Sequence, residues 1–323
     1  MEKQLTMNLE RVEAQEVEWL WYPYIPRGKL TILQGDPGEG KTMILTGIIS
    51  ALSKGEPIYN QELGSEPAAT IYQTAEDGLA DTIKPRLLAA DADCSKVFVI
   101  CENDNDYITF TDDRIEQAIR ETGAKLFILD PWQAFLGDNV DMHRANSVRP
   151  AFRKLSDVAA RTGCAILLVG HMNKMQGVKG MYRGLGSIDI AGSARSILLV
   201  SRPKKTAEEV YLAQIKSNLA EKGPCVVFSI EDMKATFRGT SEVDAEKLLN
   251  GESGSVEPRS SKTMQAIEKL QELFEEGDEI LCKEIYDLFA EMDIGHRTVD
   301  IAKHELGIRS VKRGDRWYWS GRK

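Results

Sequence analysis

Short apolar runs rich in β-branched residues recur along the first two thirds of the chain, each followed by a more polar stretch with a helical pattern. Several runs are apolar at nearly every position, which is typical of parallel strands covered by helices on both faces. This alternation predicts an α/β fold around a mostly parallel, twisted sheet. The predicted strands are 29–35, 69–75, 96–101, 125–130, 165–170, 196–202, 210–216 and 225–230.

Helical patterns at 114–121 and 147–162 separate the early strands of this series. The last three strands follow one another after short connections, so we expect them to add antiparallel to one edge of the sheet. The composition then changes at 239–262, where Gly, Ser and Glu predominate and predict a flexible linker. The chain is thus divided into a core at 1–238, the linker at 239–262 and a small domain at 263–323.

The small domain combines three short helical patterns with a predicted hairpin that turns at Gly314 and Asp315. Three helices and a two-stranded ribbon have the outline of a winged helix. Trp317, Tyr318 and Trp319 alternate along the second strand of the ribbon, and we expect Trp317 and Trp319 to pack into the core of this domain.

Composition limits the partners and the compartment of this protein of 323 residues. The net charge of −9 and the pI of about 5.2 exclude a global attraction to nucleic acid or to an anionic membrane. The five cysteines form no C-x-x-C pair, which favours reduced thiols over disulfides or a zinc site. The N-terminal segment is too charged for a signal peptide, and no apolar run is long enough to span a membrane. We therefore expect a cytoplasmic protein without a membrane partner.

The segment "GDPGEGKT" matches the pattern G-x-x-x-x-G-K-[ST] between an apolar strand and an apolar helix. Its glycines allow consecutive N–H groups to surround a phosphate, and the helix N-terminus adds its positive dipole end. Lys41 would reach the β and γ phosphates of ATP, and the Thr42 hydroxyl would hold Mg²⁺. The alternative is a glycine-rich turn that binds nothing. The predicted nucleotide-binding residues are Gly35, Asp36, Pro37, Gly38, Glu39, Gly40, Lys41, Thr42 and Met43.

Three further polar residues follow predicted strands, where ligands gather in α/β sheets. Asp130 suits a carboxylate that faces Mg²⁺ through water, although an aspartate there could also cap a helix. Glu76 could accept a proton from the attacking water, whereas the adjacent Asp77 suits a helix N-cap better. His171 could sense hydrolysis through a hydrogen bond to the γ-phosphate, or could be an ordinary loop histidine.

These segments in this order resemble the RecA-type ATPases, especially the hexameric plasmid-replication helicases of the RepA type and related ATPases of phages and mobile elements. The resemblance covers about residues 19–235. RecA-type ATPases carry the catalytic glutamate on the strand after the phosphate loop, and here Asp130 is followed by Pro131 rather than by a glutamate. The resemblance rests on "YIPRGKLTILQGDPGEGKT", "IYQTAEDGLADTIKPRL", "LFILDP", "GHMNK", "RGLGSIDIAGSARSILLV" and "IKSN".

The resemblance implies roles for the matching positions. Lys41 would contact the phosphates, Thr42 and Asp130 the metal, and Glu76 would be the general base. His171 matches the histidine after the fourth core strand, where some members have two in a row and this chain has Gly170 first. Two further basic residues match groups that act on a neighbouring subunit, which implies an oligomer, expected to be a six-membered ring. They are Arg195 as the trans-acting arginine and Lys216 as the lysine that assists it.

The charge of the C-terminal domain is uneven. Residues 262–295 carry 3 Lys and Arg against 10 Asp and Glu, whereas residues 296–323 carry 8 against 3. One basic side is expected for a module that binds DNA, although winged helices also serve protein contacts. The predicted phosphate contacts are Arg297, Lys303, Lys312, Arg313 and Arg316.

The function that these features predict is Mg²⁺-dependent ATP hydrolysis coupled to movement on DNA or to its unwinding. Single-stranded DNA would pass through the ring, where the loop 173–184 with Lys174, Lys179 and Arg183 could follow its backbone. Two alternatives stay open: an ATP-controlled regulator that binds duplex DNA, and a loader that recruits another helicase. Glu76 and Arg195 favour an ATPase over either non-enzymatic alternative, because simple nucleotide binding needs neither.

Overall fold

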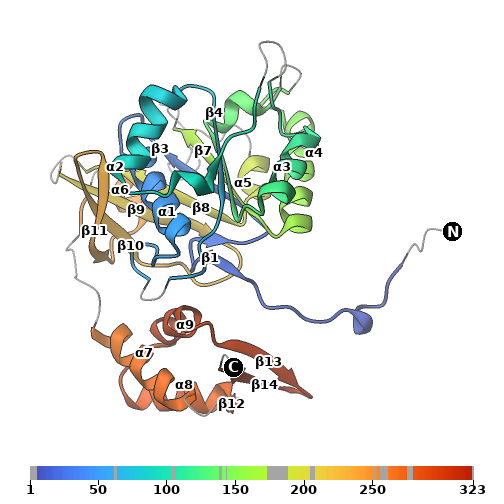
Figure 1. Ribbon diagram of the computed structural model, residues 1–323. Helices are drawn as coiled ribbons and strands as arrows, with labels where there is room; N and C mark the ends of the chain where they lie inside the picture. The colour runs from blue at the N-terminus through green and yellow to red at the C-terminus, as the bar shows by residue number, and fades with distance from the viewer. Residues whose placement is uncertain are drawn as a thin grey trace.

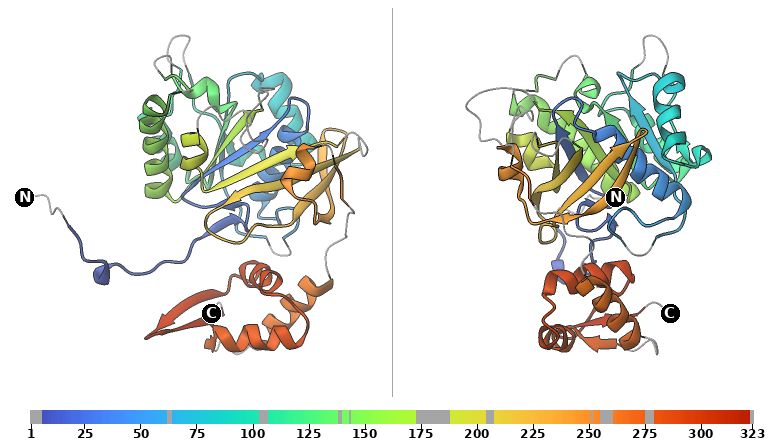
Figure 2. Two further views of the ribbon diagram at one scale, coloured as in Figure 1. Left: turned by 180° about the vertical axis from the view of Figure 1, so that it is seen from behind. Right: turned by 90° about the vertical axis from the view of Figure 1, so that its left-hand side faces the viewer.

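The computed structural model describes residues 6–61, 64–102, 107–137, 140–142, 144–172, 188–203, 208–250, 252–254, 261–274 and 279–321. These residues form an α/β core and a smaller C-terminal unit that lies beside one end of the core (Figure 1). The N-terminal segment runs as an extended arm between the two before it enters the core (Figure 2). None of the described helices is both long and apolar enough to cross a membrane.

The core is built on one sheet, in which the described strands follow the order β11-β10-β9-β8-β3-β7-β6-β4-β5. The six strands from β8 to β5 in this order run parallel, and β9, β10 and β11 extend the sheet in antiparallel fashion. This confirms the predicted α/β class with a mostly parallel sheet. The bounds are β3 Leu30–Gly35, β4 Thr70–Thr74, β5 Val97–Phe98, β6 Leu126–Asp130, β7 Ala165–His171, β8 Ser196–Ser201, β9 Glu209–Ser217, β10 Cys225–Glu231 and β11 Lys234–Ser241.

Helices cover both faces of the sheet, with α1 and α2 on one side and α3 and α4 on the other (Figure 1). Because successive side chains of a strand point to opposite faces, Ile32 of β3 packs in the cluster with α3 and α4. Its neighbour Leu33 packs in the cluster with α1. The helices are α1 Lys41–Lys54, α2 Lys84–Ala89, α3 Asp113–Thr122, α4 Ala145–Thr162, α5 Ile188–Ser193 and α6 Ala245–Leu249, with short turns at η1 Leu9–Arg11, η2 Leu79–Ile83, η3 Cys94–Lys96 and η4 Trp132–Phe135.

A short hairpin, β1 (Trp19–Trp21) and β2 (Ile25–Pro26), precedes β3. The parallel strands then bring their carboxyl ends to one edge of the sheet. In the strand register Gly35 lies beside His171, and Thr74 lies beside Asp130. The residues that follow β3, β4, β6, β7 and β8 therefore gather at this edge, where ligands bind in α/β folds.

Three details of the core differ from the sequence-based expectation. Strand β8 pairs parallel with β3 instead of antiparallel, with Ser196 at the start of β8 beside Thr31 near the start of β3. The strand predicted at 96–101 is confined to β5, Val97–Phe98. The predicted linker also begins too early: β11 continues to Ser241, and α6 buries Leu248 in the core.

The C-terminal unit has the element order α7-β12-α8-α9-β13-β14 and a three-stranded antiparallel sheet, β12-β14-β13. Its own apolar cluster includes Phe289, Val299 and Trp319. Trp319 is buried as predicted, but Trp317 is 44% exposed, because it stands nearer the hairpin turn. The bounds are α7 Ser261–Phe274, β12 Glu279–Leu281, α8 Cys282–Glu291, α9 His296–Glu305, β13 Arg309–Arg313 and β14 Arg316–Ser320.

Candidate nucleotide site

The loop between β3 and α1 has backbone geometry that glycine alone adopts without strain. Gly38 and Gly40 have φ of +81° and +97°, in the left-handed region that favours glycine. A Cβ on Gly40 would lie 2.4 Å from Cδ1 of Ile230, and a Cβ on Gly35 would lie 2.4 Å from the carbonyl oxygen of Val200. Helix α1 begins directly after this loop without a side-chain N-cap. The loop and the helix end thus form a tight backbone cradle of the kind that holds phosphate.

Lys41, the first residue of α1, points its ammonium group back across the loop. Its Nζ donates to the carbonyl oxygens of Gly35 at 2.8 Å and Asp36 at 2.9 Å, and lies 3.3 Å from Nδ1 of His171. The residue is buried, and burial lowers the pKa of Lys41 against the opposing effect of Asp130 and nearby carboxylates. An anionic ligand would supply a negative charge to balance the positive charge of this buried ammonium group.

His171, at the end of β7, lies between Lys41 and Glu76. An ammonium group can only donate, so Nδ1 of His171 is the atom that would accept from Lys41, and Nε2 of the ring faces Glu76. That Nε2 lies 3.7 Å from Oε2 of Glu76. The three residues, from the start of α1, the end of β7 and the turn after β4, form a polar series across the cavity.

The two acidic residues after β4 have different surroundings. The backbone N–H groups of Glu76 and Asp77 both donate to the Thr74 hydroxyl, which fixes this turn. The Asp77 carboxylate is bound to Arg86 of α2 at 2.7 Å. The Glu76 side chain is 64% exposed and turned toward His171. The Glu76 carboxylate is therefore more accessible to a water molecule than the paired Asp77 carboxylate.

Asp130 ends β6 and is held by a residue that the sequence patterns did not single out. The Tyr72 hydroxyl of β4 donates to Oδ2 of Asp130 at 2.7 Å. Burial raises the pKa of Asp130, and the Tyr72 hydrogen bond and Lys41 act in the opposite direction. Asp130 and Thr42 both line the same cavity, and hydroxyl and carboxylate oxygens are the ligands that Mg²⁺ prefers. Within the described part of the chain there is no cluster of three His, Cys, Asp or Glu side chains that could hold a metal by itself.

The cavity that contains these groups measures about 330 Å³. Arg202, just after β8, and Arg86 were not assigned to the site from the sequence. Arg202 follows a strand that was expected to be antiparallel; once β8 is known to be parallel, Arg202 falls at the carboxyl edge with the other site residues. The lining residues are Gly38, Gly40, Lys41, Thr42, Met43, Thr74, Glu76, Asp77, Arg86, Asp130, His171, Arg202 and Ile230.

Glu39 extends the phosphate loop toward Arg202. Burial raises the pKa of Glu39, and a hydrogen bond from the Arg202 backbone N–H to the Glu39 carboxylate offsets part of this rise. The carboxylate thus stands at the side of the cradle where β8 ends, next to the Arg202 side chain.

Two predicted catalytic residues are not part of this cavity. Arg195 is exposed and precedes β8, and its backbone N–H donates to the carbonyl oxygen of Leu30 at the start of β3. The phosphate loop follows the other end of β3, roughly 17 Å away for a strand of this length. Lys216 lies near Arg195, and its Nζ donates to the carbonyl oxygens of Ala191 and Ala194. Neither residue reaches the site of its own chain.

The residues predicted to contact DNA differ in their exposure to solvent and in their partners. Lys312, Arg313 and Arg316 are exposed around the hairpin β13–β14, and Arg313 also pairs with Glu279. The prediction for Lys303 as a surface phosphate contact is wrong for this structure, because its side chain is only 5% exposed and paired with an acidic residue. Arg297 lies at a cavity between α9 and the core. The residues of the expected DNA loop, Lys174, Lys179 and Arg183, lie outside the described residues.

Comparison with known proteins gives three findings. The family model AAA_25, described as an AAA domain, matches residues 1–177, which include the phosphate loop, Glu76, Asp130 and His171. The DNA repair protein RadA of Halalkalibacterium halodurans is 27% identical over 156 residues. A crystal structure of a KaiC-like protein from Pyrococcus horikoshii aligns with a TM-score of 0.48 and 16% identity, over 66% of this chain and 91% of the other.

These matches cover different shares of the proteins. The RadA alignment spans 47% of this chain but only 30% of the RadA protein, so most of that relative has no counterpart in the alignment. The family model covers more than half of the chain, and it ends before β8 and the C-terminal unit.

Proposed function

The chain belongs to the AAA_25 family of AAA domains, and from this membership we propose that it is a Mg²⁺-dependent ATPase that works on DNA as a ring. The observation that carries the proposal is the series Lys41–His171–Glu76, which joins the phosphate cradle to a carboxylate in one cavity. A cradle without Glu76 would suffice for binding a nucleotide. A carboxylate placed across the cavity from the lysine supports hydrolysis.

Each side chain has a distinct part in this proposal. The backbone N–H groups of the loop and the Lys41 ammonium bind the triphosphate, which replaces the carbonyl oxygens that Lys41 contacts now. Glu76 takes a proton from the attacking water, and His171 orients Glu76 through Nε2. Mg²⁺, held by Thr42 and by Asp130 directly or through water, would stabilise the negative charge that builds up on the phosphate oxygens.

The ring is proposed from the position of Arg195. This exposed arginine lies at the opposite end of the sheet from its own nucleotide cavity, so it could stabilise transition-state charge only in a neighbouring subunit. Lys216 binds the carbonyl oxygens at the end of α5 and is placed to keep the segment before Arg195 in position. The resemblance to hexameric RepA-type helicases favours six subunits.

The DNA partner is proposed from two features. The element order α7-β12-α8-α9-β13-β14 with its three-stranded sheet supports a winged helix, whose hairpin carries Lys312, Arg313 and Arg316. The matched relative is named as a DNA repair protein. We propose translocation or unwinding of DNA as the work that hydrolysis drives. An ATP-controlled DNA-binding regulator is the second candidate, favoured by the packing of α9 against the core.

ATP turnover with and without single-stranded DNA tests this function in the wild type, in Glu76→Gln and in Arg195→Ala. We expect DNA to stimulate the wild type and each variant alone to be inactive. Mixing the two variants should restore turnover, because the Glu76→Gln subunit supplies an intact arginine to the intact glutamate of its neighbour. Equal rates for all three proteins would rule out the ring mechanism, and slow turnover without stimulation by DNA would favour the regulator.

A further inference from the structure

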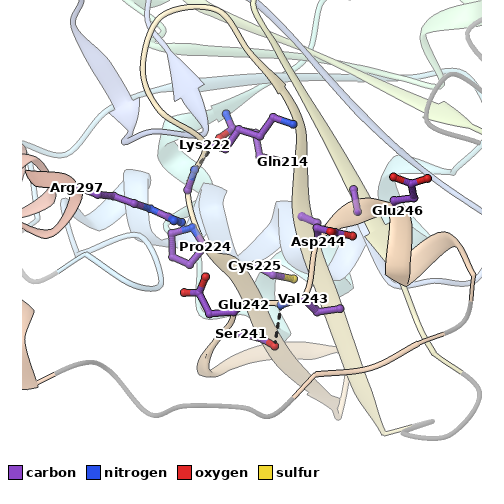
Figure 3. Close-up of a pocket in the computed structure, with 13 residues that line it drawn as sticks. Gln214, Lys222, Pro224, Cys225, Ser241, Glu242, Val243, Asp244, Glu246 and Arg297 are labelled. Carbon is purple, nitrogen blue, oxygen red and sulfur yellow. Dashed lines mark hydrogen bonds between the residues drawn. The ribbon is translucent and has the colours of Figure 1, made fainter. Parts of the chain in front are cut away.

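Helix α9 turns its outer face toward the core instead of toward solvent. Val299 and Ala302 pack inside the C-terminal unit. On the other side of the helix, Arg297 lies at a cavity of about 350 Å³ beside the core, and Figure 3 shows it reaching toward Pro224 with Glu242 nearby. The ring of His304 stacks on Tyr22 of the core, with 3.9 Å between ring centroids. The face that a winged helix uses for DNA is therefore covered.

The N-terminal arm makes the strongest contact with this unit through Glu16. One carboxylate oxygen accepts a hydrogen bond from Nζ of Lys303 at 2.5 Å, and the other accepts one from the backbone N–H of Ser310 at 2.9 Å. Lys303 also donates to the Ser310 hydroxyl at 2.6 Å. Lys303 lies in the last turn of α9 and Ser310 belongs to β13, so Glu16 joins the helix to the first strand of the hairpin.

The group of donors that Glu16 meets is built into the C-terminal unit. Lys303 is 4% exposed, and its ammonium lies 4.9 Å from the centre of the Trp319 ring. Burial alone would raise the pKa of Glu16, but the hydrogen bonds from Lys303 and Ser310 outweigh it and lower the pKa below its usual value. An ammonium, a hydroxyl and a backbone N–H directed at one anion are the donors that bind a phosphate group.

We propose that Lys303 and Ser310 form a phosphate-binding site for the DNA backbone, which Glu16 occupies in this structure as an internal substitute. The inference rests on the proposed binding of DNA by the C-terminal unit. DNA then competes with the arm: when a backbone phosphate replaces the Glu16 carboxylate, the arm releases Lys303 and Ser310. The N-terminal arm thereby limits the affinity of the C-terminal unit for DNA.

The surroundings suit an exchange of this kind. A cavity of about 440 Å³ lies beside the contact and is lined by Lys303, Ser310 and Trp317, and also by the acidic Glu221 and Asp300. The exposed Lys312 and Arg316 of the hairpin lie in the same unit and extend its basic surface. The arm itself offers a carboxylate to Lys303, which imitates the charge of a backbone phosphate.

The test uses the full-length protein with Glu16→Gln, and Glu18→Gln as the matched control. Glu18 belongs to the same arm, but its carboxylate pairs with Arg27 of the core at 2.7 Å. Two quantities are measured: hydrogen exchange of the Ser310 amide without DNA, and binding of a fluorescein-labelled duplex by anisotropy. We expect Glu16→Gln to speed the exchange and to raise duplex affinity about tenfold or more. Glu18→Gln should leave both at the wild-type level.

Adding Lys303→Met to Glu16→Gln should abolish the gain in affinity, and inorganic phosphate should compete with the duplex in the Glu16→Gln protein. Unchanged exchange in Glu16→Gln would overturn the proposal, and so would faster exchange without tighter binding. If either result were obtained while the wild type still bound DNA and its ATP turnover was stimulated by DNA, the proposed function would stand. If no protein in the series bound any DNA, the proposed function itself would fail.

Discussion

The hydrogen bond from Tyr72 to Asp130 allows a direct test of the proposed role of Asp130 in holding Mg²⁺. Tyr72→Phe removes a hydroxyl that donates at 2.7 Å to a mostly buried carboxylate, and the Tyr72 side chain is 1% exposed. Hydrogen bonds to charged groups contribute about 1.5–3 kcal/mol. We therefore expect the free energy of unfolding at pH 7 to fall by about 1.5–3 kcal/mol in urea titrations. The Mg²⁺ concentration needed for half-maximal ATP turnover should rise, because Asp130 loses the group that orients it.

The pH dependence of this change has a definite sign. Burial raises the pKa of Asp130, so as the pH falls the folded protein takes up this proton before the unfolded chain does. The ionised carboxylate therefore lowers stability at neutral pH, and stability from this group recovers as the pH falls through its folded pKa. Tyr72→Phe raises that pKa further, so its destabilising effect should be largest near pH 7 and smaller in acid.

Tyr211→Phe is the matched control. The Tyr211 hydroxyl also donates to a carboxylate at 2.7 Å, that of Glu209, and its side chain is fully buried away from the nucleotide cavity. It should lose comparable stability while its Mg²⁺ requirement stays at the wild-type value. The reasoning about Asp130 is refuted if Tyr72→Phe unfolds within about 0.5 kcal/mol of the wild type, or if both variants shift the Mg²⁺ requirement equally.

The remaining tests concern the phosphate loop, the interface and the end of the core. Gly40→Ala should weaken ATP binding about tenfold or more by calorimetry, because the added methyl group clashes with a side chain of β10 and the backbone φ is unfavourable for alanine. Gly123→Ala, at a position with φ of +65° and open space around it, should leave ATP binding unchanged. Burial, and then Lys303, lower the pKa of His304 to about 4, so the neutral imidazole favours the packing of α9 against the core. Acidification from pH 7 to 5 should therefore cost up to about 2 kcal/mol of the stability of this packing and speed hydrogen exchange in α9. Unchanged exchange would contradict this. Leu248→Ala should lower the free energy of unfolding by about 2–4 kcal/mol in urea titrations, since Leu248 is 2% exposed, and a change near zero would show that α6 does not pack on the core.

The gathering of the candidate site residues in one cavity could be predicted because its signals are local in the sequence. The glycine spacing specifies the backbone of the loop, and the polar residues directly after β4, β6 and β7 fall at one sheet edge whenever those strands are parallel. Gly170 shows why no histidine pair occurs here: a Cβ at this position would lie 2.6 Å from Nε1 of the buried Trp132. That contact depends on packing between residues far apart in the chain, which no local pattern indicates.

The parts that sequence patterns missed depend on distant partners. Arg202 was overlooked because β8 pairs parallel with β3, and the residue pattern of β8 itself does not specify the direction of pairing. The burial of Lys303 depends on Glu16, which is 287 positions away in the chain. A basic residue on an expected recognition helix gives no signal that an acidic side chain near the other end of the chain covers it.

The most direct test of the account compares two neighbouring carboxylates in single-turnover ATP hydrolysis, with ATP affinity measured on the same samples. Glu76 faces His171, whereas Asp77 is already bound to Arg86. Glu76→Gln should slow hydrolysis by about 100-fold or more and leave ATP affinity little changed, while Asp77→Asn should retain most of its rate. Normal hydrolysis by Glu76→Gln, or loss of hydrolysis in Asp77→Asn alone, would contradict the assignment of Glu76 as the base.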